Sequence, residues 1–336
     1  MRQRLTIILT FAVIIGLLAL VSSIRYVKKE KQQDLEFAPN RSTYHSGPTG
    51  VRAFFDFLHE SGYKVIRWRD QPQKLLTDSG KSIKTFVVVG KTPVRFSDAE
   101  WEALTKWIAA GGCYVVIDRH PLTEEKAKAK TSWDIISTQL EFPTLDVNPA
   151  NVKQMTGEVV ALQPVQPTVF THNIQSVLPS RFASRMTVVP PEEVEPQDDE
   201  TTGKSPAPVV HIADDKGALL IDYTYGAGNV VILSDPYIVS NGGIKLDDNL
   251  QLALNVLTAR DGLIAFDEYH QGRGITRNAF ASYFAGTPVL PITGQLVLLV
   301  LVVLCSAVFM LLLDTTIVNV ALVTLGREFD VPPVTT

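Results

Sequence analysis

The sequence has little cysteine and no excess of basic residues. Its 336 residues include two cysteines, Cys113 and Cys305, so a disulfide framework is excluded as the basis of the fold, and this pair does not indicate a redox compartment. The formal net charge is -4, which provides no basic surface field for a nucleic-acid backbone. We therefore expect no nucleic-acid partner.

Sequence motifs for two common kinds of site are also missing. There is no Gly-x-Ser-x-Gly or Gly-x-Cys-x-Gly segment, which would place a nucleophile on a tight turn between a strand and a helix. Gly226-Ala227-Gly228 precedes a predicted strand, whereas a phosphate-binding loop follows one. Cys113 begins its strand and is expected in the core, but Ser234 follows a strand and is a weak candidate nucleophile. We expect no metal and no cofactor.

A long uncharged run near the N-terminus extends from Leu5 to Val21. It approaches the roughly 20 apolar residues that cross a bilayer, and it predicts a transmembrane helix over residues 5–24. The arginines before it and Val21-Ser22-Ser23 after it also fit a cleaved signal peptide. We favour an uncleaved anchor because the apolar run is longer than the core of a usual signal peptide.

A second uncharged run, Leu296 to Leu313, predicts a transmembrane helix over residues 292–313. Two spans would place both termini on one side of a membrane and the intervening domain on the other. The positive-inside rule slightly favours a cytoplasmic domain, because basic residues are more numerous after the first span than before it. These residues are Arg2 and Arg4 before the span, and Arg25, Lys28, Lys29 and Lys31 after it.

Between the two spans, a polar tether over residues 25–39 leads into a domain over 40–290. Apolar periodicity alternates between helix and strand, which predicts an α/β fold with a doubly wound, mostly parallel sheet. Helices are expected at 51–62, 97–110 and 247–259, and strands at 63–68, 85–89, 113–117, 230–233 and 263–266.

An irregular insertion is expected at about residues 121–208. It contains a short helical pattern near Trp133 to Leu140, scattered prolines and a solvated acidic loop that begins at Pro190. After it, Val209 to Ile212 and Ala218 to Tyr223 predict a β-hairpin.

Polar residues follow three of the predicted strands. In open α/β sheets the carboxyl ends of the strands are where ligands bind, so these residues predict a ligand-binding cleft. The alternative is that each residue caps a helix or fixes a turn. The residues are Asp118, Arg119 and His120 after the strand at 113–117, Ser234 and Asp235 after 230–233, and Asp267, Glu268 and His270 after 263–266.

Four segments together resemble a bacterial membrane-anchored family, domain of unknown function family 4350. They are NRSTYHSGPTGVRAFFDFLHESGYKVIRW from Asn40, WIAAGGCYVVI from Trp107, GAGNVVILSDPYIVSNGGIKLDDNLQLALNVL from Gly226 and IAFDEYHQG from Ile264. The resemblance covers about residues 38–300. It implies a class I glutamine-amidotransferase-like fold without the catalytic elbow, an extracytoplasmic domain, and a link to a MoxR-type ATPase system.

The tail, residues 314–336, departs from that family. Leu313 to Leu322 is instead similar to the first-helix motif of major-facilitator drug:proton antiporters, with Val323 where their proline stands. One helix cannot form a transporter, which needs an alternating-access bundle. In those antiporters this helix runs outward from the cytoplasm, which would agree with the charge count and not with an extracytoplasmic domain.

These patterns favour a membrane-anchored, non-catalytic ligand-binding or protein-interaction module. Its expected partners are the lipid bilayer and a membrane protein. A hydrolase or amidase that uses the strand-end polar residues is the alternative, and a transport-associated component, suggested by the tail alone, is a further one.

Overall fold

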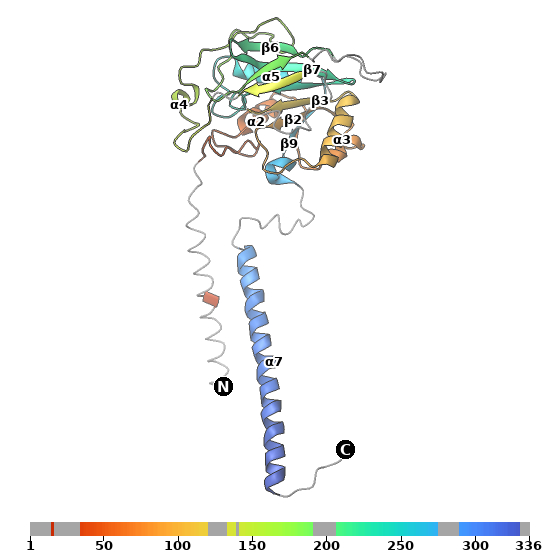
Figure 1. The fold of residues 1–336 in the computed structure, drawn as a ribbon, viewed down its shortest axis with the longest axis vertical. Helices are drawn as coiled ribbons and strands as arrows, with labels where there is room; N and C mark the ends of the chain where they lie inside the picture. The colour runs from red at the N-terminus through yellow and green to blue at the C-terminus, as the bar shows by residue number, and fades with distance from the viewer. Residues whose placement is uncertain are drawn as a thin grey trace. The chain divides into compact units, whose positions relative to one another are not determined.

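A computed structural model describes residues 15–16, 34–119, 133–138, 141–190, 206–274 and 289–329. One compact unit comprises residues 33–275, and the C-terminal helix belongs to a second unit. The first unit, called the folded unit below, contains a nine-stranded mixed sheet with helices on its faces (Figure 1). The expected α/β class is therefore confirmed.

Five strands of the sheet run parallel and form its core. In spatial order they are β1 (Val65–Trp68), β9 (Leu263–Asp267), β2 (Ile83–Val89), β3 (Cys113–Ile117) and β8 (Gly228–Leu233). The other strands extend the sheet with antiparallel pairing. They are β7 (Gly217–Tyr225) beside β8, then β5 (Arg185–Val189) and β4 (Asp134–Thr138), with β6 (Val209–Asp214) also paired to β7.

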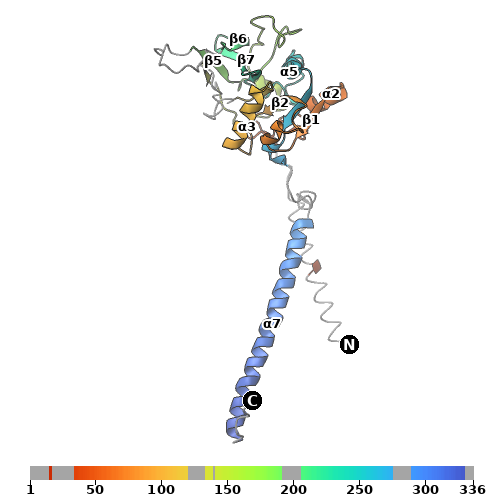
Figure 2. The ribbon, with the colours of Figure 1, turned by 90° about the vertical axis from the view of Figure 1, so that its right-hand side faces the viewer.

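Helices cover both faces of the parallel strands. Figure 2 shows α3 (Asp98–Ala109) on one side of the sheet, and α2 (Arg52–Glu60) and α5 (Asn249–Thr258) on the other. Alternate residues of β2 therefore enter different cores: Val87 packs with the α2 and α5 side chains, and Phe86 packs with those of α3. Burial on both faces explains why β2, β3 and β8 contain uninterrupted apolar runs rich in valine and isoleucine.

The predicted helix boundaries agree closely with the structure. Ser97 caps α3: its hydroxyl accepts a hydrogen bond from the Glu100 backbone, and the Glu100 carboxylate accepts one from the Ser97 backbone, which confirms the predicted capping box. The short helices are η1 (Pro72–Leu76), α4 (Val152–Thr156) and the single turn η3 (Tyr269–Arg273).

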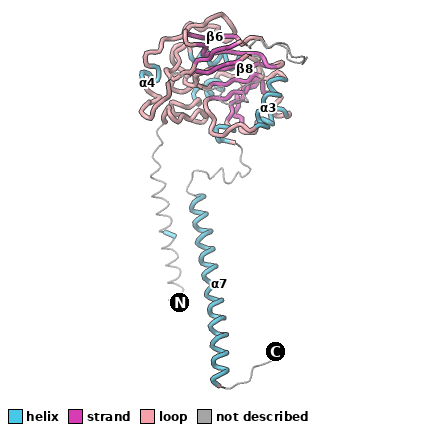
Figure 3. Tube along the Cα trace, viewed as in Figure 1, coloured by secondary structure: helices cyan, strands magenta, loops and turns pink. Residues whose placement is uncertain are grey.

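The predicted short helix near residues 133–140 is wrong. Asp134–Thr138 forms β4 instead, paired antiparallel with β5 through Ile135 opposite Val188 and Ser137 opposite Met186. Two consecutive isoleucines favour a strand once a partner strand is available. Figure 3 shows long loops around the short helix α4, as expected for an insertion.

The N-terminal boundary of the domain also differs from expectation. The sequence predicts residues 34–39 as the end of a solvated tether, but they belong to the folded unit. Glu36 is only 1% exposed. We call residues 34–50 the strap, because they pass over the strand ends described below.

The C-terminal unit contains α7 (Val289–Glu328), a single long helix. Among the described residues it provides the one candidate membrane span, Ile292–Leu322. The helix continues past Leu313 to Glu328 without a break. The other expected span, residues 5–24, lies outside the described residues except for Ile15 and Gly16.

Candidate functional site

The predicted cleft residues lie at the carboxyl ends of β3, β8 and β9. His120 is outside the described residues, and Asp118 is half-buried with its carboxylate bonded to the Arg119 backbone at 2.8 Å. The remaining predicted residues are buried. Because β2 separates β9 from β3 in the sheet, the residues that follow β9 form groups separate from the residues that follow β3 and β8.

The first group surrounds the guanidinium of Arg119. Its Nη2 lies 2.6 Å from Oε1 of Glu36, 3.3 Å from Oγ of Ser180 and 3.7 Å from Oδ1 of Asp235. Arg41 also pairs with Glu36, so the group contains two cations and two carboxylates. We call Glu36, Arg41, Arg119, Ser180 and Asp235 the Arg119 cluster.

Asp235 is held within this cluster by three further donors. Its carboxylate accepts hydrogen bonds from the Ser180 backbone at 2.5 Å, the Ser180 hydroxyl at 3.0 Å and the Tyr237 backbone at 3.1 Å. Burial, together with the carboxylates of Asp235 and Glu36, raises the pKa of the Tyr237 phenol, which keeps its proton. These bonds fix the loop that follows β8 to the loop before β5.

The second group forms around Glu268. Its carboxylate accepts hydrogen bonds from the Ser42 hydroxyl at 2.7 Å, the Thr43 backbone at 2.6 Å and the Thr43 hydroxyl at 2.7 Å. Arg67 donates to the Thr43 hydroxyl at 2.9 Å and lies over the Phe55 ring. Glu268 therefore attaches the strap to the end of β9.

Asp267 and His270 form a third group beneath α3. Nδ1 of His270 lies 2.6 Å from Oδ2 of Asp267, and the imidazole stacks on Phe96 with ring centroids 3.5 Å apart. Nε2 is 3.8 Å from the Glu100 carboxylate. Asp267 and Glu268 thus face different neighbours, as expected for adjacent residues near a strand end. No group of three or more metal-ligating side chains occurs among the described residues.

Ser234 does not have the placement of a nucleophile. It is fully buried, and its hydroxyl donates toward the backbone oxygens of Ser184 at 2.8 Å and Leu219 at 3.2 Å. These contacts join β8 to the antiparallel part of the sheet. Cys113 is also buried, which raises the pKa of its thiol to about 11 and keeps it protonated near neutral pH.

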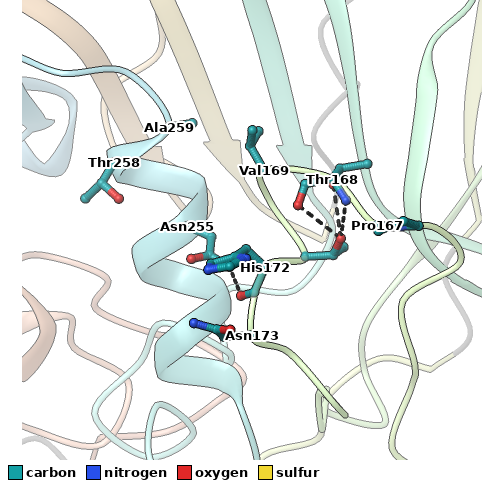
Figure 4. A pocket seen from close by; sticks show the side chains of 9 residues that line it. Pro167, Thr168, Val169, His172, Asn173, Asn255, Thr258 and Ala259 are labelled. Atoms are coloured by element: carbon teal, nitrogen blue, oxygen red, sulfur yellow. Dashed lines mark hydrogen bonds between the residues drawn. The ribbon is translucent and has the colours of Figure 1, made fainter.

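An open hollow of about 690 Å³ lies away from these groups, between α5 and the loop 167–173 (Figure 4). Asn255 of α5 donates to the backbone oxygens of Phe170 and His172 and holds the loop in place. On the loop side, the Thr168 hydroxyl is 3.0 Å from Nδ1 of His211, whose Nε2 is 2.8 Å from Oδ1 of Asp222.

Sequence reasoning missed the strap residues Glu36, Arg41, Ser42 and Thr43. Each is polar and precedes the first helix, so composition alone indicates solvent exposure. The segment Asn40-Arg41-Ser42-Thr43-Tyr44 is part of the family resemblance, and that is the available indication that these residues have structural partners.

The fold and these contacts define an α/β domain closed at its strand ends by its own N-terminal segment and followed by an apolar helix. The model for DUF4350, a domain of unknown function, matches residues 43–257, so the chain belongs to this family. No curated protein matches the chain.

Solved structures show only distant similarity. The N-terminal domain of mmIFT52 is 14% identical with a TM-score of 0.39, and the match covers 60% of this chain and 86% of that one. A cytoplasmic protein of Salmonella typhimurium LT2 is 12% identical with a TM-score of 0.37, covering 62% and 86%. An exo-β-1,4-mannosidase from Opitutaceae bacterium strain TAV5 is 11% identical with a TM-score of 0.31, covering 52% and 25%.

Proposed function

We propose that the protein is a membrane-anchored interaction module that performs no catalysis at its strand ends. The observation that supports this proposal is the burial of the strand-end side chains, whose polar atoms bind other groups of the same chain. Arg119 and Glu268 bind the strap. A substrate would have to displace Glu36 from Arg119, or Ser42 and Thr43 from Glu268, to reach them. An interaction role requires no activated nucleophile at these positions.

The proposed setting is a bacterial cytoplasmic membrane crossed twice, with the folded unit on the extracytoplasmic side. The apolar α7 supports one crossing, and the family resemblance, including the amidotransferase-like fold, motivates the rest. A fluorescent protein fused after Thr336 tests the sidedness, because it folds in the cytoplasm. Fluorescence is expected, and a dark but stable fusion would contradict it. The resemblance of the tail, residues 314–336, to an antiporter helix motivates a further proposal, that the protein is a transport-associated component.

Exposed apolar side chains on the insertion provide the contact surface in this proposal. Phe142 is 70% exposed and Val160 is 79% exposed, and Leu145, Val165 and Val169 of the same region are also exposed. Large apolar side chains left in solvent are typical of protein-binding surfaces when they gather in one region. We propose a MoxR-type ATPase system as the source of the partner.

Co-purification tests this role. The full chain in detergent micelles would be co-expressed with a MoxR-type ATPase system from the same genome. Phe142→Ser combined with Val160→Ser is expected to reduce recovery of the partner at least tenfold, because transfer of these side chains into a contact provides the binding energy.

The matched control is Val94→Ser with Tyr63→Ser, which alters two exposed apolar side chains elsewhere on the folded unit. Both double variants should melt like the wild type, because exposed substitutions have small effects on stability. Equal recovery of the partner by wild type and both variants would count against the insertion as the contact surface.

A hydrolase is the second candidate, and one specific observation favours it. Thr168 lines the hollow of Figure 4. Its hydroxyl is bonded in series to the imidazole of His211 and the carboxylate of Asp222. A base beside a hydroxyl, oriented by a third group, is the arrangement that activates a nucleophile.

A fluorophosphonate probe on the purified full chain separates the two candidates. If the protein is an interaction module, the probe should not label it. Ser234→Ala should leave the labelling unchanged, because Ser234 is already buried. Labelling that disappears in Thr168→Ala but persists in Thr258→Ala would establish the hydrolase instead. Thr258 is the matched control because it lines the same hollow and its hydroxyl donates to the Leu254 backbone oxygen.

A further inference from the structure

The first half of the strap, residues 34–41, and the second half, residues 42–50, are attached to the rest of the folded unit in different ways. Residues 42–43 are held by Glu268, and both of its carboxylate oxygens have donors. Residues 34–41 bond largely within the strap: Asp34 accepts from Thr49, and Arg41 donates to the Thr49 backbone. Within the described residues, the polar contact that joins residues 34–41 to the sheet is the ion pair of Glu36 with Arg119.

Hydrogen bonding around that ion pair is incomplete. Oε2 of Glu36, Nε of Arg41 and Nε of Arg119 are buried without a hydrogen-bond partner. All three residues are more than nine-tenths buried. Buried polar atoms that lack partners lower the stability of the closed arrangement. Release of residues 34–41 therefore costs less free energy than release of residues 42–43, which Glu268 holds.

Arg119 is positioned by groups outside the strap. Ser180 and Asp235 contact its Nη2, and its guanidinium lies over the Phe182 ring at 5.3 Å. An arginine held in this way presents a planar, charged donor set that is well suited to a carboxylate. Glu36 occupies that position as a side chain of the same molecule.

We propose that Arg119, with Ser180 and Asp235 beside it, is a carboxylate-binding site for an acidic segment of a partner protein, and that Glu36 is its resident intramolecular ligand. Release of residues 34–41 opens the site, while Glu268 keeps the rest of the strap in place. This inference rests on the proposed interaction role and names the chemistry of the partner.

Gly90 provides an independent means of opening the strap. It follows β2 with φ +65°, and a Cβ at this position would lie 2.5 Å from Cγ of Arg41. Gly90→Ala therefore displaces Arg41 without changing the charge of Glu36 or Arg119. It complements Glu36→Gln, which removes the carboxylate charge and preserves the side-chain shape.

The test uses the full chain in detergent micelles and a labelled synthetic peptide of residues 34–41 with blocked ends. Both Glu36→Gln and Gly90→Ala are expected to bind this peptide at least tenfold more tightly than the wild type does. A second peptide, in which glutamine replaces the glutamate, should lose at least tenfold in affinity. Adding Arg119→Met to Glu36→Gln should abolish binding. Glu102→Gln, on the exposed face of α3, is the control and should behave as wild type.

Hydrogen exchange separates this inference from a purely structural role. Glu36→Gln should accelerate amide exchange at least tenfold in residues 34–41 and leave β3 unchanged. Equal acceleration throughout the folded unit, or equal binding of the native and the glutamine-substituted peptides, would overturn the inference. If peptide binding fails while partner recovery still depends on Phe142 and Val160, the interaction role stands and the carboxylate site does not.

Discussion

Glu268→Ala is expected to lower the free energy of unfolding of the folded unit by about 3–5 kcal/mol. The carboxylate is buried and receives donors from Ser42 and Thr43, so its removal leaves three donor groups without their acceptor. Hydrogen bonds to a charged group contribute about 1.5–3 kcal/mol each, but water that enters the site replaces part of that contribution. For a domain of this size the melting temperature should fall by roughly 10 °C.

Urea denaturation of the full chain in micelles, followed by tryptophan fluorescence, measures this effect. Glu268→Gln should retain part of the stability, because its amide oxygen still accepts hydrogen bonds. Glu60→Ala removes an exposed carboxylate at the end of α2 and should change the free energy of unfolding by less than about 0.5 kcal/mol. A loss for Glu268→Ala as small as that of Glu60→Ala would mean that the strap does not stabilise the strand ends.

The parts of the fold that can be predicted from sequence are those with local causes. Strand β3 is predicted at its observed bounds because Cys113–Ile117 is a continuous apolar run between two glycines and an aspartate. Helix α3 is predicted because Ser97 and Glu100 form a capping box within one turn. In both, the residues that determine the element are neighbours in the chain.

The closure of the strand ends has causes that are distant in the chain. Arg119 pairs with a glutamate 83 positions earlier, and Glu268 binds Ser42 across 226 positions. A single sequence does not reveal such pairings, and the polarity of the strap suggests a solvated tether. The topological rule locates the polar residues correctly at the carboxyl ends of the strands, but it does not reveal that the chain itself covers them.

The predicted ligand-binding cleft differs from the observed arrangement for the same reason. Adjacent polar residues at a strand end are expected to line one open site, but Asp267 turns toward His270 and Glu268 toward the strap. Burial is the deciding quantity here, and burial depends on what packs over a residue. The amphipathic patterns indicate which face of each element is covered, but not that the segment before α2 covers the edge of the sheet.

Arg119→Met is expected to destabilise the folded unit by about 3–5 kcal/mol, because it leaves two buried carboxylates with a single cation. Glu36 keeps Arg41, and Asp235 keeps its bonds to Ser180 and Tyr237, but the cluster then carries an uncompensated negative charge. Methionine fills much of the space of the arginine side chain, so the loss should arise mainly from charge and hydrogen bonding. The measurement is again urea denaturation of the full chain.

A double-mutant cycle distinguishes charge imbalance from lost packing. Asp235→Asn added to Arg119→Met restores neutrality in the cluster, while the one remaining side-chain oxygen still accepts one of the two hydrogen bonds from Ser180. We expect the double variant to be more stable than the sum of the single losses predicts by about 1–3 kcal/mol. Additive losses would show that Asp235 does not use Arg119 as a counter-ion. Coupling would establish that the Arg119 guanidinium compensates the buried charge of Asp235.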